Sequence, residues 1–376
     1  MKIVFVCGSL EPGRDGVGDY ARRLAAELIR QGHQVAALAL HDTYVEAELS
    51  GTQQAEQVQL SVLRIPASYK ETARFAAAQQ WVDAINPDWL SLQYVAFAFQ
   101  PKGLPWGLGE SLARLGRGRR WHIMFHELWV GVFIDAPLKH IVWGWVQKQL
   151  IKSMVKTLRP AVMHTQTRLY QLLLGRLGFK ADYLPLFANI PVTSTQKKPA
   201  QLGADGSDNT VSVIIFGTIH PGTAIAQFAQ EASQIAKTKG TQFSLTTIGR
   251  CGANLEPFVK TWQDEGLTVN ILGEQPAEKI SEVLRNGTIG LSTTSLVVTE
   301  KSGTVAAMVE HGLPVLCIAR AWWPRGVPSL EQPVGIAEYH PGTLDTYLSN
   351  IETPQFTSTV PEIARVMAQA LATATK

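Results

Sequence analysis

The chain has 376 residues, and at about 150 residues per domain this length favours two domains over one. Hydrophobic residues make up 45% of the chain and charged residues 17%, so we expect long buried elements and exclude a disordered chain. The net charge is only +3, from 34 Lys and Arg against 31 Asp and Glu. This excess does not indicate nucleic-acid binding, and no nucleic-acid partner is expected.

The cysteine pattern favours a reducing compartment. Cys7, Cys251 and Cys317 are far apart, and Cys7 and Cys317 end apolar runs typical of buried strands. Neither a disulfide framework nor a zinc ribbon fits this spacing. The apolar run Ile3–Val6 is shorter than a signal-peptide core, and nowhere do about 18 apolar residues follow one another. We expect a cytoplasmic protein that is soluble, or peripheral at the inner face of a membrane at most.

The first half of the chain alternates strands and helices, which predicts a parallel, doubly wound sheet. Its first helix has apolar residues at helical spacing after Asp19, which we expect to cap it, and ends at Gly32. The predicted strands are Ile3–Cys7, Gln34–Leu40, Trp89–Tyr94, Trp121–Phe125 and Ala161–Thr165, and two further helices are predicted near Glu71–Ile85 and Pro137–Leu158.

A second alternating series follows a polar stretch rich in Pro, Thr, Lys, Gly and Ser, a composition typical of a linker. Its predicted strands are Val211–Phe216, Phe243–Ile248, Leu267–Leu272, Thr288–Ser292 and Leu313–Ile318. Its predicted helices are Ala224–Lys237, Leu255–Gln263, Pro276–Asn286 and Gly303–His311, and a last helix covers Pro361–Ala372.

These patterns predict two Rossmann-like domains in tandem. We expect an N-terminal domain over residues 1–193, a linker over 194–210 and a C-terminal domain over 211–357, with a helix at about 358–376 packing back on the first domain. Open α/β sheets bind ligands at the carboxyl ends of their strands. The predicted architecture therefore has both sheets facing a cleft between the domains.

Two segments resemble anion-binding elements. Gly13, Gly16 and Gly18 precede the first helix, where glycines let a loop approach a ligand and helix amides attract an anion, although a plain flexible loop is an equal alternative. Ser302–Thr304 begin a helix directly after Glu300-Lys301; the alternative is a serine that caps a structural helix. The P-loop glycine five residues before the lysine is missing.

The order of several loose motifs resembles the retaining GT-B glycosyltransferases, particularly glycosyltransferase family 4. The resemblance spans nearly the whole chain. In the second half it rests on Leu272-Gly273-Glu274, Gly287–Ser292, Glu300–Gly303 and Glu310–Val315, and in the first half on the glycine loop before Asp19–Arg22, the strand Trp89–Tyr94 and Phe125-His126-Glu127.

The resemblance implies a donor site that holds a nucleotide diphosphate sugar as substrate, with no cofactor. His126 and Glu300 match residues that contact the transferring sugar, and they are the implied catalytic residues. The implied donor-binding residues are Gly16, Gly18, Gly217, Thr218, Arg250, Lys301, Ser302, Gly303 and Thr304.

Two positions depart from the family pattern. The segment Thr218–Thr223 lacks the arginine and lysine that usually neutralise the diphosphate, and the residue eight places after Glu300 is Met308 instead of the second glutamate, with Glu310 two places later. The chain contains no Asp-x-Asp sequence, which argues against a metal-dependent GT-A enzyme. We expect no metal, and Lys301 or Arg250 would neutralise the leaving group.

The segment Pro137–Arg159 has a basic amphipathic pattern with two tryptophans. It fits peripheral membrane contact by an enzyme with a lipid-linked acceptor, or alternatively a helix that covers the sheet with a solvated basic edge. The arginines at 117, 119 and 120 add positive charge nearby in sequence.

Three functions are consistent with these patterns. The first is a glycosyltransferase with a saccharide, lipid-linked or small-molecule acceptor, retaining on the evidence of the resemblance. The second is a catalytically silent GT-B protein that binds a sugar nucleotide or a partner enzyme. The third is a nicotinamide-dependent oxidoreductase with Asp42 as a ribose ligand, for which the glycine order is wrong.

Overall fold

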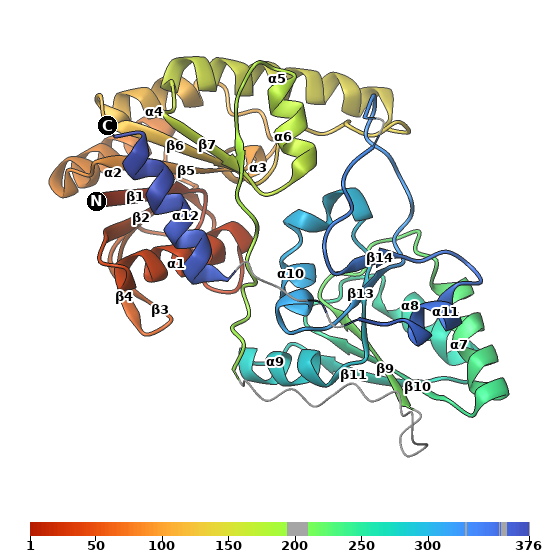
Figure 1. The fold of residues 1–376 in the computed structure, drawn as a ribbon. Helices are drawn as coiled ribbons and strands as arrows, with labels where there is room; N and C mark the ends of the chain where they lie inside the picture. The colour runs from red at the N-terminus through yellow and green to blue at the C-terminus, as the bar shows by residue number, and fades with distance from the viewer. Residues whose placement is uncertain (194–209, 328, 353, 355–358, 376) are drawn as a thin grey trace. The chain divides into compact units, whose positions relative to one another are not determined.

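The computed structural model describes residues 1–193, 210–327, 329–352, 354 and 359–375. The chain forms two compact units (Figure 1). Unit 1 comprises Met1–Pro185, Pro324–Pro328 and Ser358–Lys376, and unit 2 comprises Leu186–Trp323 and Ser329–Thr357. Each unit is built around a largely or fully parallel sheet, which confirms the predicted fold class of two α/β domains.

The sheet of unit 1 has eight strands in the order β3-β4-β2-β1-β5-β6-β7-β8. All neighbours pair in parallel except β3 and β4, which are antiparallel. The strands are β1 (Lys2–Cys7), β2 (Gln34–Asp42), β3 (Leu49–Ala55), β4 (Val58–Pro66), β5 (Trp89–Tyr94), β6 (Arg120–Phe125), β7 (Val162–Thr165) and β8 (Asp182–Tyr183).

Among the residues that the structure describes, seven helices belong to unit 1. Helix α1 packs on β1, β2 and β4 because its apolar face, including Leu24 and Leu28, is fully buried. Helix α12 lies against α1, which places the last helix of the chain in unit 1 (Figure 1). The helices are α1 (Gly16–Arg30), α2 (Glu71–Ile85), α3 (Ala96–Phe99), α4 (Leu108–Gly116), α5 (Leu138–Leu158), α6 (Arg168–Gly175) and α12 (Val360–Thr373).

The sheet of unit 2 has six parallel strands in the order β11-β10-β9-β12-β13-β14. These are β9 (Thr210–Phe216), β10 (Gln242–Ile248), β11 (Thr268–Gly273), β12 (Ile289–Ser292), β13 (Val315–Cys317) and β14 (Ile336–Glu338). The helical segments are α7 (Ile225–Lys239), α8 (Leu255–Asp264), α9 (Ala277–Asn286), the 3-10 turn η1 (Leu296–Lys301), α10 (Gly303–Glu310) and α11 (Leu344–Ser349).

Alternate residues of β9 enter two different cores. Val213 and Ile215 join a cluster with Phe228 and Trp262, while Ile214 joins a cluster with Leu284. Because successive side chains of a strand point to opposite faces, the sheet of unit 2 is covered on both faces at β9. This double burial explains why β9 runs as the apolar sequence Val213–Phe216.

The structure differs from the predicted organisation at the edge of the first sheet. The hairpin β3–β4 was not predicted, because β3 is a polar and mostly exposed edge strand without an apolar alternation. Its turn consists of Glu56 and Gln57, both with positive φ (44° and 69°), as two-residue hairpin turns require. The first sheet is therefore mixed instead of purely parallel.

The boundary between the units also differs from the predicted one. Unit 1 ends at Pro185 instead of residue 193, because the segment after it packs on unit 2. Ala188 is fully buried in a core of unit 2, and the Thr193 N–H donates to Ser281 Oγ at 3.2 Å. The predicted linker lies outside the described residues except for Thr210, which begins β9.

Candidate functional site

The glycine-rich stretch of unit 1 connects β1 to α1. Helix α1 begins at Gly16, and the Asp15 carboxylate caps it by accepting the Gly18 N–H at 2.6 Å. A Cβ at Gly18 would lie 2.5 Å from the Ser9 carbonyl oxygen, whereas a Cβ at Gly16 would meet nothing within 4 Å. The packing of the loop therefore requires glycine at 18, while Gly16 leaves open space at the start of the helix.

Asp19 does not cap α1, contrary to the sequence-based expectation. It lies in the first turn, and its two carboxylate oxygens accept the Gly13 N–H at 3.0 and 3.1 Å. Arg22 donates to the same carboxylate at 3.0 Å. The misplaced cap arose because Asp15 and Asp19 both precede apolar residues at helical spacing, and sequence alone does not distinguish a cap from a first-turn acid.

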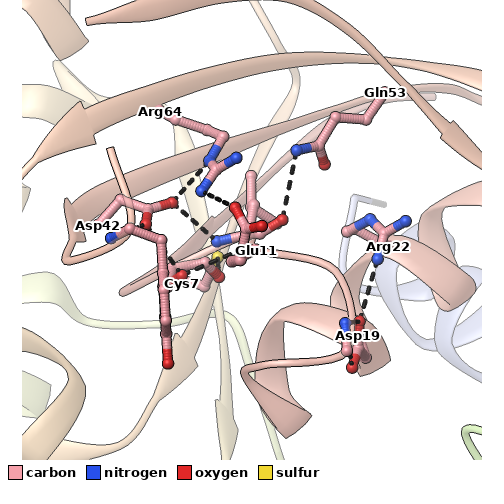
Figure 2. Close-up of polar contacts among 11 residues, drawn as sticks. Cys7, Glu11, Asp19, Arg22, Asp42, Gln53 and Arg64 are labelled. Atoms are coloured by element: carbon pink, nitrogen blue, oxygen red, sulfur yellow. Dashed lines mark hydrogen bonds and ion pairs between the residues drawn. The ribbon is translucent and has the colours of Figure 1, made fainter. Parts of the chain in front are cut away.

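A buried carboxylate at the end of β2 holds the other side of this loop (Figure 2). Asp42 is completely buried and pairs with Arg64 Nε on β4 at 2.7 Å. It also accepts from the Leu10 N–H and the Ser9 hydroxyl at 3.1 Å each, and from the Tyr44 N–H at 3.0 Å. Both carboxylate oxygens are therefore engaged, and two of the four donors come from the loop.

The same arginine extends the network to the loop's own side chain. Arg64 Nη2 lies 2.5 Å from a Glu11 carboxylate oxygen, and Gln53 on β3 donates to the Leu10 carbonyl at 3.3 Å (Figure 2). Burial by itself raises the pKa of Asp42, but Arg64 and the backbone N–H donors outweigh it and hold that pKa below its usual value. We call this set of contacts around Asp42 and Arg64 the loop clamp.

The loop clamp bears on the oxidoreductase alternative. A ribose ligand at the end of β2 must be reachable by a nucleotide, but Asp42 has no exposed surface and already accepts four hydrogen bonds. The carboxylate therefore serves the fold of the glycine loop. This use argues against nicotinamide binding at the first βαβ unit.

His126 follows β6, at the carboxyl end of the first sheet, and is only 5% exposed. Its Nε2 atom lies 2.9 Å from Gln93 Oε1 and its Nδ1 atom 3.2 Å from Gln166 Oε1. The Tyr20 ring of α1 packs edge-on against it, with ring centroids 4.9 Å apart. The imidazole is thus held between β5, the segment after β7 and α1.

In unit 2 the predicted donor-binding residues gather at the carboxyl edge of the sheet. Gly217 follows β9 with φ of +79°, and a Cβ there would lie 2.7 Å from Thr304 Cγ2 in the first turn of α10. A Cβ at Gly249, after β10, would lie 3.5 Å from the Gly217 nitrogen. Glycine at 217 therefore allows a strand end to approach a helix N-terminus.

The loop after Gly217 is tied to the neighbouring strand end. Thr293, after β12, donates its hydroxyl to the Thr218 carbonyl at 3.1 Å and accepts the His220 N–H at 3.0 Å. The Thr218 side chain itself is exposed. This arrangement fixes the loop backbone and leaves the threonine side chain on the surface of the edge.

The start of α10 carries the remaining motif residues. Ser302 caps the helix through its side chain, and its hydroxyl lies 3.0 Å from Thr304 Oγ1. A Cβ at Gly303 would meet nothing within 4 Å, so space adjoins the first turn. Glu300 and Lys301 end the 3-10 turn η1, which was not predicted from the sequence. The helix N-terminus and a lysine thus lie in adjacent turns.

Two arginines lie along the same edge. Arg250, after β10, is half-exposed and pairs with Glu274 at 3.2 Å. Arg320, three residues after the end of β13, was not predicted; a Cβ at Gly222 would lie 3.6 Å from its Cδ atom. Its stem therefore packs beside the loop that follows Gly217. Because ends of parallel strands share one edge, a search for cations after every predicted strand would have found it.

The two departures from the family pattern have structural consequences. Met308 is 1% exposed and belongs to the core of unit 2, so it offers no group to a ligand. Glu310 accepts the Ala188 N–H at 2.6 Å and thereby holds the segment that enters unit 2. The structure thus gives one carboxylate oxygen of Glu310 a backbone partner within unit 2.

The predicted site residues divide between the two units. Gly16, Gly18 and His126 belong to unit 1, and the others belong to unit 2. Across the residues that the structure describes, no group of three or more His, Cys, Asp or Glu side chains could hold a metal ion. No helix in the described part of the chain is long and apolar enough to cross a membrane.

Comparison with solved structures identifies the fold. The Anabaena HepE protein in complex with UDP and glucose is similar with a TM-score of 0.58 and 17% identity, covering 99% of this chain and 100% of that one. The catalytic domain of Starch Synthase IV from Arabidopsis thaliana, bound to ADP and acarbose, has a TM-score of 0.56 and 12% identity over 100% of both chains.

A UDP-GlcNAc 2-epimerase from Neisseria meningitidis bound to UDP-GlcNAc is similar at a TM-score of 0.56, with 13% identity over 99% of this chain and 100% of that one. The sequence matches no protein-family model and no curated protein. At these identities the likeness establishes the GT-B fold, which transferases and an epimerase share, and no particular activity.

Proposed function

We propose that the chain is a glycosyltransferase that moves a sugar from a nucleotide diphosphate sugar to an acceptor hydroxyl. In this proposal it acts as the retaining, metal-independent enzymes of glycosyltransferase family 4 do, with the donor on unit 2 and a saccharide, lipid-linked or small-molecule acceptor on unit 1. The observation that carries the proposal is the approach of Gly217 to Thr304, which joins a strand end to a helix N-terminus at the edge of the sheet.

The chemistry of a diphosphate fits this edge. The first turn of α10 offers backbone N–H groups and the positive end of the helix dipole, and the open space at Gly303 admits a bulky anion. Lys301 adds a positive charge in the adjacent turn. As the leaving group departs, these fixed donors and charges stabilise the negative charge that develops on the diphosphate.

Arg320 supplies the charge that the family pattern places after Gly217. Its stem packs beside Gly222, so it approaches the same loop from β13 instead of from within the loop. A guanidinium presents several N–H donors in a plane that matches two phosphate oxygens. In this proposal Arg320 and Lys301 share the neutralisation of the diphosphate.

Glu300 and His126 are the proposed contacts of the transferring sugar. Glu300 would accept hydrogen bonds from sugar hydroxyls and orient the ring for attack by the acceptor. His126 would meet the sugar through Nδ1, the nitrogen that faces Gln166, when that amide turns aside. Both roles follow the family resemblance.

The proposal is tested by turnover of a panel of UDP, ADP, GDP and dTDP sugars, with and without simple sugar acceptors. Release of the nucleotide diphosphate is measured, and we expect one donor to be consumed faster when acceptor is present. Glu300→Gln should lower that turnover about a hundredfold, in the range for loss of one group that acts in the transition state. Donor consumption without transfer would instead indicate hydrolysis or epimerisation.

A matched control separates this effect from general damage. Glu278 is an exposed residue in the first turn of α9, and Glu278→Gln should leave turnover unchanged. If Glu300→Gln were as active as the unsubstituted chain, the role assigned to Glu300 would be wrong.

A second candidate is a catalytically silent GT-B protein that binds a sugar nucleotide or a partner enzyme. The buried Met308 and the backbone contact of Glu310 favour it, because together they remove the carboxylate expected to hold the donor ribose. It predicts a rise in melting temperature with one nucleotide sugar and no release of nucleotide diphosphate with any acceptor. Slow, reproducible release would reject it.

We further propose that α5 brings the protein to a cytoplasmic, anionic membrane surface. Leu138, Val142 and Trp145 are four and three residues apart, lie on one helix face and are 75%, 56% and 61% exposed. Lys152 and Lys156 continue that face by helical spacing, and the helix contains no acidic residue. The exposed face of α5 therefore has an apolar N-terminal end, which suits lipid tails, and a basic C-terminal end, which suits anionic head groups.

The membrane proposal is tested by flotation with phosphatidylcholine vesicles with and without phosphatidylglycerol. Binding should require the anionic lipid, weaken at high salt and fall in Trp145→Ser. Trp106→Ser is the control, since Trp106 is similarly exposed at 65% outside α5. Equal binding of both vesicle types, or none, would favour a solvated basic edge on α5.

A further inference from the structure

One face of the first sheet carries a chain of buried polar side chains. Ser91 and Gln93 lie two residues apart on β5, and His122 and His126 lie four apart on or just after β6, so each pair shares a face. His164 on β7 completes the row. All five are at most 5% exposed. We call them the polar row.

The hydrogen bonds of the polar row run in one direction. Gln93 Nε2 donates to Ser91 Oγ at 2.8 Å, which leaves the serine hydroxyl hydrogen for His122 Nδ1 at 2.7 Å. His122 must then carry its own proton on Nε2, where it donates to His164 Nδ1 at 3.0 Å. In this arrangement both histidines are neutral and hold their proton on Nε2.

The other end of the row reaches His126. Gln93 is oriented by Ser91, so its Oε1 atom faces His126 Nε2 at 2.9 Å and accepts a hydrogen from it. The proton of a neutral His126 is thereby committed to Nε2, and Nδ1 becomes an acceptor. The Gln166 amide then turns its NH2 group toward Nδ1, in place of the oxygen assigned 3.2 Å away.

The surroundings keep the inner histidines uncharged. Burial lowers the pKa of His122 well below its ordinary value, and the nearby His164 and His126 lower it further. Burial lowers the pKa of His164 to about 4, although Asp182 on β8 acts in the opposite direction. A neutral imidazole has one donor and one acceptor nitrogen. In a row of hydrogen-bonded rings, the tautomer of one ring therefore sets the tautomer of the next.

We propose that Ser91, Gln93, His122 and His164 are positioning residues that fix the tautomer of His126, so that Nδ1, once the Gln166 amide turns aside, accepts a hydrogen bond from a hydroxyl of the bound sugar. The proposal rests on the proposed function for the identity of that ligand. The proposal explains why three imidazoles are buried on this sheet face, although burying a polar group costs desolvation free energy that an apolar side chain would not. It also selects for a hydroxyl, since a ligand group without a hydrogen cannot donate to Nδ1.

The test is nitrogen-15 NMR of the full chain with labelled histidine. Single His→Asn variants assign the signals of residues 122, 126 and 164, and neutral tautomers differ clearly in their two nitrogen shifts. We expect the Nε2–H tautomer at all three, and no change for His122 and His164 between pH 8 and pH 6. Ser91→Ala should shift His122 and His126 toward mixed tautomers and lower transfer turnover about tenfold, with unchanged melting-temperature response to the donor.

The controls separate this proposal from the function on which it rests. Ser233 is a buried serine of unit 2 whose hydroxyl donates to the Glu265 carbonyl, and Ser233→Ala should move none of the three signals. Gln93→Met is the second variant should Ser91→Ala fold poorly. A chain that turns over no sugar nucleotide but has the expected tautomers rejects the function alone. An Nδ1–H tautomer at His122, or altered tautomers with unaltered turnover, overturns the positioning role.

Discussion

The loop clamp makes a sharp prediction about stability. Asp42 has no exposed surface, and Arg64, its partner at 2.7 Å, has a side chain only 6% exposed. Replacing Asp42 by asparagine keeps the shape and part of the hydrogen bonding, and the Arg64 guanidinium still pairs with the Glu11 carboxylate. Breaking a buried pair by removing one charge costs about 3–5 kcal/mol. Because Glu11 remains, we expect Asp42→Asn to lie at the lower end, about 3 kcal/mol.

The structure also predicts which segments of the chain lose stability in Asp42→Asn. Urea unfolding measures the total change in the free energy of unfolding. Hydrogen exchange followed by mass spectrometry shows which peptides lose protection. At about 1.4 kcal/mol per factor of ten, peptides covering the glycine loop, β2 and β4 should exchange about a hundredfold faster. Peptides of unit 2 should be unchanged. The exposed pair Lys260–Asp264 provides the control, since Asp264→Asn should scarcely affect exchange.

A double variant tests whether the stability lost in Asp42→Asn comes from leaving the buried Arg64 charge without its partner. Asp42→Asn combined with Arg64→Met removes both charges, so the combined loss should be smaller than the sum of the single losses. A loss below about 1 kcal/mol for Asp42→Asn alone, or additive losses in the double variant, would refute the argument that a desolvated charge pair holds the loop.

Three further predictions follow from single sites. Gly18→Ala, which drives a Cβ to 2.5 Å from a carbonyl oxygen, should destabilise the protein by about 1–3 kcal/mol. Gly16→Ala should not, and equal melting temperatures for the two variants would contradict the assignment. Burial lowers the pKa of His164 from 6.5 to about 4, so the folded state resists its protonation. Stability should therefore be full above about pH 6.5 and fall by about 3 kcal/mol toward pH 4 in urea titrations, with this part missing in His164→Asn. Arg320→Met should weaken binding of a nucleoside diphosphate about tenfold while sparing the monophosphate, as measured by calorimetry; equal weakening of both would show that Arg320 does not contact the outer phosphate.

Much of the fold could be predicted because the strands are buried on both faces. Ile3–Cys7 is continuously apolar and Val211–Phe216 is apolar except for Ser212, and each is followed by a helical apolar period, so local pattern and tertiary position agree. The hairpin β3–β4 was missed for the same physical reason. Its strand β3 lies at the sheet edge beside β4 alone, and the exposed residues of β3 carry no burial signal; the largely buried strand β4 was also not predicted.

The candidate site was only partly readable. Gly217 was implied by the family resemblance and Ser302–Thr304 by a predicted helix start, and the parallel sheet brings the end of β9 to the start of α10. Arg320, a proposed phosphate contact, was not predicted because it has no motif of its own and is far from Gly217 in sequence. Its relevance comes from the strand order β9-β12-β13, which only the folded sheet defines.

The sequence by itself determined the alternation of elements, the two α/β units and the glycines at their strand ends, because these depend on local periodicity and backbone sterics. Tertiary structure decided which polar groups are available to a ligand. Asp42 and Glu310 carry the same carboxylate chemistry in the sequence as a ligand-binding acid, but one is buried against Arg64 and the other accepts a backbone N–H. Burial and pairing depend on residues distant in sequence, so no local pattern encodes them.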